Sequence, residues 1–342
     1  MLKEISEEPE VLRRIEKGNA ETLDRLSYAV RDSGITNVIF AGRGTSDHAG
    51  IYGQYMFQIF CEMSTGLATA SAVTVYGAEN CYKNSLVIAL SQSGYAADAL
   101  EVLKAAKKCG ALTASVTNDG DSPLAKEADF SLDCCAGPEF SVAATKTFTA
   151  ELAIMYLLAL RISGIKERGR LLCAADAVET IIKDYDAGIK ALASKYKDIK
   201  DGFVLSRGIT YPIALESALK IQETCYIKMK GYSVSDFYHG PLAQIESDTV
   251  TVVYAVKGKA ENDGIGAADR LVSIGNRPLV VTDDFELKDR YENVMLVPDC
   301  GDEFLAPVVL ATFAQLFAFH LCLARGGNPD CPRNLKKVTV TR

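Results

Sequence analysis

Short, mostly apolar runs alternate with segments of helical periodicity along the chain. The runs at residues 35–40, 85–90 and 112–117 have the length and composition of strands, and residues 47–60 and 95–109 between them have helical periodicity. Continuous apolar strands that alternate with helices are typical of a parallel sheet covered by helices on both faces. The pattern therefore predicts an α/β fold with parallel sheets.

Further helical patterns lie near both ends of the chain. Two charged amphipathic stretches, at about residues 7–17 and 20–32, predict two helices before the first strand. Residues 304–324 contain no charged side chain and are as long as a membrane-spanning helix. Because Pro307 and His320 interrupt this stretch and no second one exists, we expect a buried helix and not a membrane span.

The second half of the chain repeats the first. Residues 202–208 resemble residues 38–44, and residues 281–284 resemble residues 116–119 at nearly the same separation. A repeat this long predicts two copies of a domain and not a solenoid. The expected parts are an N-terminal helical segment (1–19), a first domain (20–165), a linker helix (166–194), a second domain (195–330) and a C-terminal tail (331–342).

Composition excludes several classes of function. The chain has 342 residues, a formal net charge of −7, ten cysteines and three histidines. An acidic chain is a poor general nucleic-acid binder, because phosphate contacts need clustered cations. The cysteines lack C-x-x-C spacing and the histidines are far apart, so we expect no metal site. The charged N-terminus does not resemble a signal peptide, and we expect a cytoplasmic protein with reduced thiols.

Two predicted loops join a strand to the following helix and carry small and hydroxyl-bearing residues. N–H groups at the start of a helix, together with nearby hydroxyls, are suited to binding a phosphate. Either loop alone is better explained by Ser and Thr residues that cap the next helix. Both loops together in one parallel sheet favour a phosphate site. The candidate residues are Gly44, Thr45, Ser46, Ser91, Gln92 and Ser93.

Candidate titratable residues lie in the second half. Glu216, Lys220 and Glu223 are four and three residues apart, so on a helix they share one face. A carboxylate beside an amine in a cleft can move protons on and off a sugar carbon, but spacing alone favours a surface ion pair. His239 precedes Gly-Pro on a predicted turn, where a histidine is more often structural, although an ordinary imidazole pKa of about 6.5 suits proton transfer.

A basic tail ends this acidic chain. Such ends are usually frayed. Here Leu335 and Val338 are apolar and predict that the tail docks onto the body of the protein. A docked tail could deliver Lys337 to a site.

Taken together, these residues resemble the sugar isomerase (SIS) domain family, and most closely the isomerase half of the glucosamine-6-phosphate synthases (glutamine–fructose-6-phosphate transaminases). The resemblance extends from residue 4 to residue 340. It implies two tandem, doubly wound, flavodoxin-like domains, each with a five-stranded parallel sheet. Its markers are residues 4–9, 44–46, 90–94, 142–146, 211–216, 218–220, 223, 239–243, 332–335 and 337.

The resemblance also implies roles for individual residues. Glu223 matches the base that carries a proton between C1 and C2 of the sugar, and Lys220 matches a lysine beside that base. His239 matches the group associated with ring opening, which in this family comes from the partner subunit, so a homodimer with shared active sites is expected. Lys337 matches the tail lysine that reaches the open-chain sugar, and Val142 matches a backbone contact to the sugar. Ser46, Ser91, Gln92 and Ser93 match the positions that hold the phosphate. No cofactor is implied.

Several positions differ from the family pattern. Arg43 stands where a small residue or cysteine is common, and Ala96 removes a hydroxyl that faces the phosphate. The glutaminase domain of the synthases has no counterpart in this sequence, so we expect no transfer of ammonia from glutamine. Because the changes surround the predicted pocket, the substrate is expected to differ from fructose 6-phosphate. The altered positions are Arg43, Tyr95, Ala96, Ala144, Asp236 and Tyr238.

The leading hypothesis is a phosphosugar isomerase-type enzyme that acts on an amino-sugar phosphate. Its most attractive form converts glucosamine 6-phosphate to fructose 6-phosphate and ammonia. Such a reaction needs one carboxylate for proton transfer and no metal or redox cofactor. A fructosamine-6-phosphate deglycase, in which the leaving amine is an amino acid, is the alternative enzyme. A non-catalytic sugar-phosphate sensor is the alternative from another class.

Overall fold

The computed structural model describes residues 1–342 except 80–81, 336 and 338–342. Contacts divide the chain into two compact units. The N-terminal unit comprises residues 7–171 and the described part of the tail from Asn334 onward, and the C-terminal unit comprises residues 172–333 together with residues 1–6. The expected domain boundaries at 20–165 and 195–330 are narrower than these units, because the flanking helices pack within them.

The N-terminal unit is built on a five-stranded parallel sheet in the order β2-β1-β3-β4-β5. β3 is buried along its whole length, in agreement with its continuous apolar sequence. Residue Ala41 of β1 pairs with Ala89 of β3, so the two strands end at the same edge. The strands are β1 (Asn37–Ala41), β2 (Ser64–Leu67), β3 (Ser85–Leu90), β4 (Leu112–Thr117) and β5 (Phe130–Asp133).

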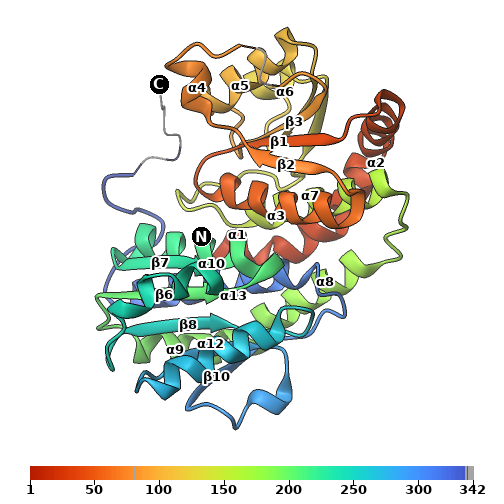
Figure 1. The fold of residues 1–342 in the computed structure, drawn as a ribbon. Helices are drawn as coiled ribbons and strands as arrows, with labels where there is room; N and C mark the ends of the chain where they lie inside the picture. The colour runs from red at the N-terminus through yellow and green to blue at the C-terminus, as the bar shows by residue number, and fades with distance from the viewer. Residues whose placement is uncertain (80–81, 336, 338–342) are drawn as a thin grey trace. The chain divides into compact units, whose positions relative to one another are not determined.

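Helices cover both faces of this sheet, as Figure 1 shows. Val87 and Ala89 of β3 pack with α5 on one face. On the other face, Phe40 of β1 meets Phe57 of α3 in a T-shaped contact at 5.6 Å, and α3 in turn packs against α7. The helices are α2 (Glu8–Ser33), α3 (Thr45–Cys61), α4 (Ala70–Thr74), α5 (Ala97–Lys108), α6 (Pro123–Glu127) and α7 (Lys146–Ser163).

The predicted division between a helix at about 7–17 and another at about 20–32 is wrong, because α2 runs unbroken through residues 18 and 19. Asn19 is buried, and its side-chain amide donates to the carbonyl of Asp133 at 2.8 Å and accepts from the N–H of Asp133 at 2.8 Å. A Cβ on Gly18 would lie 2.5 Å from the Sγ of Cys135. The two residues that resembled a helix break therefore fit α2 against the end of β5.

The C-terminal unit contains a second five-stranded parallel sheet, in the order β10-β9-β8-β6-β7. Read from β7, this order repeats that of the first sheet, and the similar sequence segments fall on β1 and β6 and at the ends of β4 and β9. The duplicated, doubly wound α/β fold predicted from the sequence is confirmed. The strands are β6 (Asp201–Ser206), β7 (Lys228–Ser233), β8 (Val250–Tyr254), β9 (Leu279–Thr282) and β10 (Asn293–Leu296).

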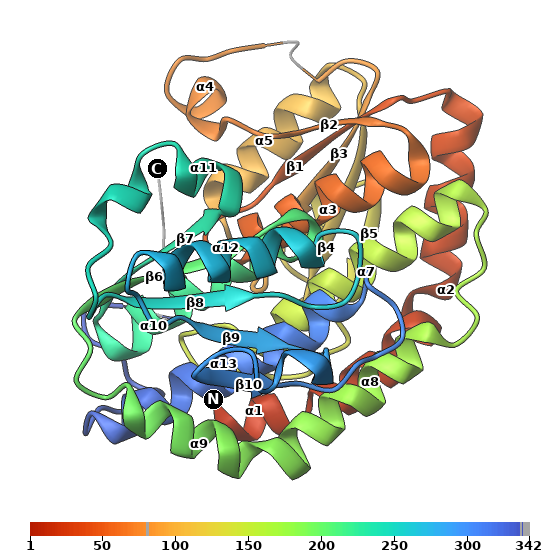
Figure 2. The ribbon, with the colours of Figure 1, turned by 60° about the horizontal axis from the view of Figure 1, so that its bottom comes forward.

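The helices of this unit again lie on both faces of the sheet, which can be followed in Figure 2. Phe203 and Leu205 pack with Leu271 of α12 on one face, and on the other Tyr254 contacts Ser217 of α10 at 2.7 Å. The helices are α1 (Leu2–Ser6), α8 (Arg170–Thr180), α9 (Asp186–Lys195), α10 (Tyr211–Cys225), α11 (Val234–Tyr238), α12 (Glu261–Ser273) and α13 (Ala306–Ala324). One π-helical turn (Ile181–Tyr185) and three 3₁₀ turns (Gly208–Thr210, Pro241–Gln244 and Phe285–Leu287) complete the helical elements of the described chain.

The long apolar stretch forms α13. This helix is long and apolar enough to cross a membrane, but 94% of its most apolar window is buried within the protein. It packs against α9 and α10, and the imidazole Nε2 of His320 lies 2.6 Å from Oδ1 of Asp186. The predicted buried helix is confirmed, and its polar histidine has a partner inside the same unit.

Candidate functional site

The two predicted phosphate loops leave neighbouring strands of the N-terminal sheet. The loop of Gly44, Thr45 and Ser46 follows β1, and the loop of Ser91, Gln92 and Ser93 follows β3. The first loop is tight, because a Cβ on Gly42 would lie 2.8 Å from the backbone of Ser46. Helix α3 begins at Thr45, so Thr45 and Ser46 occupy its first turn, where backbone N–H groups are suited to an anion.

The second loop is fastened to the end of β4. The N–H of Ser91 donates to the carbonyl of Val116, and the N–H of Asn118 donates to the carbonyl of Gln92, each at 3.0 Å. Gly94 has a φ of 70°, and a Cβ there would lie 2.0 Å from Oγ of Ser122. Only glycine fits this turn, so the backbone of the loop is held in one path.

The alternative in which these hydroxyls merely cap helices is wrong for the described loops. The N-cap residues of α3 and α5 are Gly44 and Ala96, and neither helix has a side-chain cap. The hydroxyls of Ser91 and Ser93 instead accept from the N–H groups of Gly94 and Tyr95, at 3.2 and 3.3 Å. Their hydroxyl hydrogens therefore remain suited to a phosphate oxygen.

Ser46 is in a different environment. Its hydroxyl donates to Oε1 of Glu151 at 2.9 Å, and both residues are buried. A hydroxyl has one hydrogen, so in this geometry Ser46 has no hydrogen left to donate to a phosphate. Glu151 lies on α7, 105 positions from Ser46, and no spacing in the sequence links the two residues.

The structure assigns a contact to Arg43, whose role the sequence left open. Its Nε and Nη2 lie 3.0 and 2.9 Å from Oδ2 of Asp98 in the first turn of α5. The guanidinium thus connects the loop after β1 with the helix that follows the second loop. Tyr95, another altered position, is half exposed beside Gly94.

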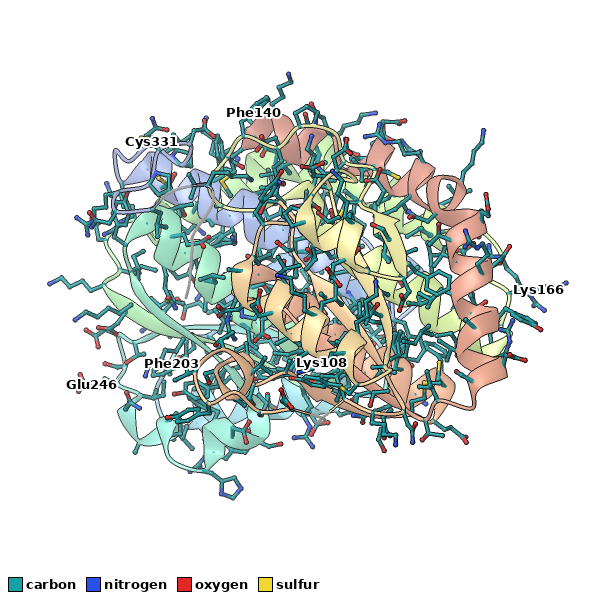
Figure 3. The ribbon with its side chains drawn as sticks, turned by 90° about the horizontal axis from the view of Figure 1, so that it is seen from above. Lys108, Phe140, Lys166, Phe203, Glu246 and Cys331 are labelled. Carbon is teal, nitrogen blue, oxygen red and sulfur yellow. The ribbon has the colours of Figure 1, made fainter. Side chains whose placement is uncertain are left out.

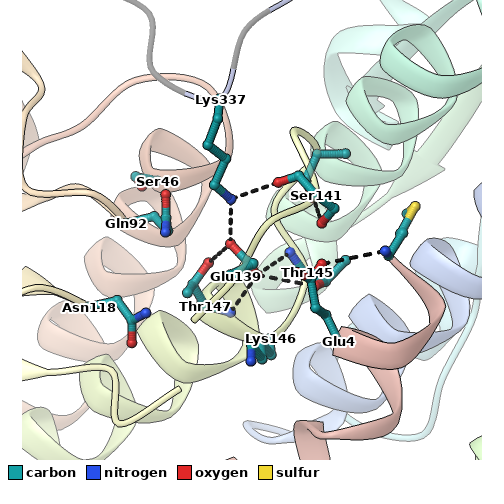
Figure 4. A network of polar contacts seen from close by, with 12 residues as sticks. Glu4, Ser46, Gln92, Asn118, Glu139, Ser141, Thr145, Lys146, Thr147 and Lys337 are labelled. Carbon is teal, nitrogen blue, oxygen red and sulfur yellow. Dashed lines mark hydrogen bonds and ion pairs between the residues drawn. The ribbon is translucent and has the colours of Figure 1, made fainter. Parts of the chain in front are cut away.

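A third loop of the N-terminal unit carries Val142, and Glu139 and Ser141 of this loop are drawn in Figure 4. Nζ of Lys337 lies 2.7 Å from the carbonyl of Ser141 and 3.0 Å from Oε2 of Glu139, whose side chain is buried. The structure therefore brings the tail lysine to the loop of Val142, and the resemblance had implied a role for each residue. Leu335 is 42% exposed and does not anchor the tail as expected, while Val338 lies outside the described residues.

Glu139 is the residue of this network that sequence reasoning missed. It lies 198 positions from Lys337, so no local spacing connects them. The available signal was weaker: Glu139 is the one acidic residue between Cys134 and Ala150, in a loop that ends at Thr145. A single carboxylate among apolar and hydroxyl-bearing residues often has a buried partner.

The C-terminal unit holds the predicted acid–amine cluster on α10. Lys220 and Glu216 have fully buried side chains, and the side chain of Glu223 is 21% exposed. Nζ of Lys220 lies 2.6 Å from Oε2 of Glu223 and 3.3 Å from Oε1 of Glu216. The surface ion pair favoured by spacing alone is therefore wrong, because this face of α10 packs against α13 and β7.

Charge decides the chemistry of Lys220. Burial alone would lower the pKa of its ammonium, but attraction and hydrogen bonds from Glu216 and Glu223 raise that pKa to about 12. Lys220 is therefore positively charged near neutrality and cannot act as a base or an amine nucleophile. It can hold the carboxylate of Glu223 in place and stabilise negative charge that develops beside it.

His239 lies apart from this cluster, on the exposed turn that follows α11. Its N–H donates to the carbonyl of Asp236 at 3.1 Å. Asp236, one of the altered positions, binds Ser233 at the start of α11, with a distance of 2.7 Å between Oγ and Oδ2. The structure thus joins Lys220 to Glu223 within α10 and places His239 on a separate turn of the same unit. Among the described residues, no group of three or more His, Cys, Asp or Glu side chains could hold a metal ion.

Comparisons with known proteins agree with the fold described above. Residues 33–161 match the sequence profile of the SIS domain. The glutamine–fructose-6-phosphate aminotransferases (isomerizing) of Thermococcus kodakarensis and Aquifex aeolicus are 35% and 36% identical to this chain over 99% and 100% of its length. The chain spans only 58% and 57% of the length of these two relatives.

Solved structures of other proteins share the fold of this chain. The C-terminal domain of glucosamine-fructose-6-phosphate aminotransferase from Francisella tularensis has a TM-score of 0.85 at 27% identity, with 97% of each chain covered. A glucosamine-6-phosphate deaminase from Thermotoga maritima has a TM-score of 0.73 at 22% identity, covering 97% of this chain and 99% of the other. The second likeness shows the fold alone.

Proposed function

The chain belongs to the SIS domain family, and from that premise we propose that it is a phosphosugar isomerase-type enzyme acting on an amino-sugar phosphate. The contact that carries this proposal is the 2.6 Å ion pair between Lys220 and Glu223. It offers a partly exposed carboxylate, held by a buried cation, as the group that moves a proton.

The most specific form of the proposal is the conversion of glucosamine 6-phosphate to fructose 6-phosphate and ammonia. After the ring opens, Glu223 removes the proton from C2 and returns it to C1, which turns the aldehyde and amine into an enolamine and then a C2 imine. Water then hydrolyses the imine, releasing ammonia and leaving the C2 ketone. The ammonium of Lys220 stabilises the negative charge that develops during proton transfer.

The N-terminal unit is proposed to bind the phosphate of this substrate. Ser91 and Ser93 have hydroxyl hydrogens suited to its oxygens, and the first turn of α3 adds backbone N–H groups. Binding energy from the phosphate, which does not react, fixes the position of the carbons that do. The ammonium of Lys337 is proposed to contact the open-chain sugar.

A direct assay tests the proposal. Purified protein is incubated with glucosamine 6-phosphate, and ammonia and fructose 6-phosphate are both measured; glucosamine without the phosphate is the control substrate. We expect both products in equal amounts, and a loss of roughly 10²–10⁴-fold in kcat for Glu223→Gln. Turnover by Glu223→Gln at the parent rate would contradict the assignment of the base. Tight binding of the sugar phosphate without any turnover would support the sensor alternative.

A fructosamine-6-phosphate deglycase is the second candidate. It is favoured by the half-exposed Tyr95 and Arg43, since a larger leaving amine needs room and polar partners near the loops. The same assay, with amino-acid conjugates of fructose 6-phosphate as substrates, separates the two enzymes. Release of the amino acid at a higher kcat/KM than release of ammonia would favour the deglycase.

We also propose that the enzyme is a homodimer that shares its active sites. The exposed turn of His239 supports this, since the imidazole is accessible to a second copy of the chain. Glu223→Gln and His239→Ala proteins should each be inactive, and mixing them should restore about a quarter of the parent activity if each site draws on both subunits. If mass spectrometry detects heterodimers but no activity returns, the proposal of shared active sites is contradicted.

A further inference from the structure

We propose that Glu139 is a positioning residue that holds the Lys337 ammonium and the loop of Val142 in place, an inference that rests on the function proposed above. Glu139 is not proposed to contact the substrate, and it affects the reaction only through Lys337 and the loop of Val142. Its carboxylate contacts donors from three places in the sequence: Thr145, Thr147 and Lys337. Figure 4 shows these contacts converging on the one side chain.

The two carboxylate oxygens of Glu139 have different partners. Oε1 accepts from the N–H and the hydroxyl of Thr145, at 2.9 and 3.1 Å, and from the N–H of Thr147 at 3.3 Å. Oε2 accepts from the hydroxyl of Thr147 at 2.8 Å and from Nζ of Lys337 at 3.0 Å. Oε1 therefore orders the backbone of the loop, and Oε2 binds the tail lysine.

Glu139 also replaces the missing cap of a long helix. Thr145 is the N-cap of α7 but makes no side-chain cap of its own. The carboxylate of Glu139 takes up the N–H groups at this end of the helix, which carries partial positive charge. The interaction ties residue 139 to the start of an 18-residue buried helix, so the loop between them is closed at both ends.

A second ion pair fixes the same helix end. Lys146 is 1% exposed, and its Nζ lies 2.5 Å from Oε2 of Glu7. Thr145 and Thr147 therefore flank a residue that is anchored independently. Because the start of α7 is held rigidly, the carboxylate bound to it can hold Lys337 rigidly too.

The one aromatic side chain of the loop does not help to order it. Phe140, next to Glu139 and labelled in Figure 3, is 83% exposed. Besides the burial of Ala143, residues 139–145 have the hydrogen bonds of Glu139 and that from Oγ of Ser141 to the carbonyl of Ala143 at 2.8 Å. Two of the three N–H groups of Lys337 are used on Glu139 and Ser141, and the third is the one we assign to the sugar.

The test compares Glu139→Gln, Lys337→Met and the double variant. We expect Glu139→Gln to lower kcat by about 10–100-fold through misplacement of the ammonium, with KM for the sugar phosphate changed less than about threefold. If Glu139 acts through Lys337, the double variant should be no slower than Lys337→Met alone. Additive losses would contradict the proposal.

Hydrogen exchange gives a readout that does not depend on turnover. Amides of residues 139–147 should exchange at least about tenfold faster in Glu139→Gln than in the parent, while those of β3 stay unchanged. The matched control is Glu101→Gln, which removes an exposed pair with Lys104 on α5 of the same unit. It should leave both kcat and exchange at the parent values.

The outcomes separate the two proposals. If the parent turns over no sugar phosphate, the proposed function fails, while exchange in the loop still reports whether Glu139 orders it. If the parent is active and Glu139→Gln keeps both the parent kcat and the parent exchange rate, this inference alone is overturned. Should Glu139→Gln fail to fold, Lys337→Met must itself lose kcat without a large change in KM, or the inference is wrong.

Discussion

Each unit of this protein contains a lysine ammonium paired with carboxylate groups. In one unit the partners lie on the same helix, and in the other the partner is far away in the sequence. In the C-terminal unit, Lys220 meets Glu216 and Glu223 on one face of a single helix. In the N-terminal unit, Lys337 meets Glu139 across 198 residues of sequence. The first cluster is built by helical periodicity, and the second only by the fold.

The two clusters also differ in exposure. Lys220 has no exposed surface, whereas the side chain of Lys337 is 26% exposed. A buried ammonium that loses its carboxylates, or the reverse, leaves an uncompensated charge without water. We therefore expect changes at Lys220 to damage stability and activity together. Changes at Lys337 should damage activity more than stability, because the buried carboxylate of Glu139 keeps its hydrogen bonds from Thr145 and Thr147.

The largest effect is expected for Lys220→Met. It leaves the buried carboxylate of Glu216 and the partly exposed carboxylate of Glu223 without their cation, and breaking a buried pair in this way typically costs about 3–5 kcal/mol in the free energy of unfolding. Activity should fall by at least about 10²–10³-fold, because the charge beside Glu223 is lost. Denaturant unfolding and the ammonia assay measure the two losses.

The contrast between the clusters provides the control for that experiment. Lys337→Met should lower kcat while the unfolding midpoint in denaturant stays near that of the parent. Lys104→Met, which removes the exposed partner of Glu101, should change neither quantity. If Lys220→Met were as stable as Lys337→Met, the prediction that burial makes the α10 cluster more important for stability would be contradicted.

Sequence reasoning recovered what depends on local pattern. The three apolar runs correspond to β1, β3 and β4, and the repeated segments fell on equivalent strands of the two sheets. The α10 cluster was recognised from spacing, yet its burial was not, because spacing cannot say what packs against that face. The same limit explains why α2 was divided in the prediction. Gly18 and Asn19 are typical of a helix end, but in the structure they pack against the end of β5 and Cys135 within a continuous helix.

Contacts between residues far apart in the sequence could not be predicted from it. Glu151, Asp98 and Glu139 each bind a residue that sequence reasoning had singled out, but from 105, 55 and 198 positions away. No local spacing links any of them to its partner. Their roles depend on where the chain returns, which neither periodicity nor composition encodes.

The pH dependence of stability offers a second way to sharpen the comparison. The pKa of Lys220 is raised from an ordinary 10.5 to about 12, so its contribution is fully present below about pH 10.5 and is lost as the pH rises through 12. The contribution amounts to about 2 kcal/mol. Unfolding free energies of the parent and of Lys220→Met, measured from pH 9 to 12, should therefore converge by about that amount. Parallel curves would contradict the raised pKa.

A smaller effect should distinguish the hydroxyls of the phosphate loops. Ser93→Ala removes a hydroxyl whose hydrogen is suited to the phosphate, and a hydrogen bond to a charged group is worth about 1.5–3 kcal/mol, or roughly 10–100-fold in KM. Ser46→Ala should raise KM less, because its hydroxyl hydrogen is used by Glu151. Equal increases in KM for the two variants would show that Ser46 releases Glu151 when substrate binds.

The smallest effect is expected at Arg43. Its pair with Asp98 is half exposed on the arginine side, so the tie between the two loops is worth less than about 1 kcal/mol, and Arg43→Ala should raise KM for the sugar phosphate by less than about fivefold. Asp98→Asn is the matched variant, because it cuts the same tie and leaves the guanidinium in place. If Arg43 only spaces the loops, both variants raise KM equally. If KM rises for Arg43→Ala alone, the guanidinium contacts the phosphate itself and takes over from the hydroxyl that Ala96 lacks.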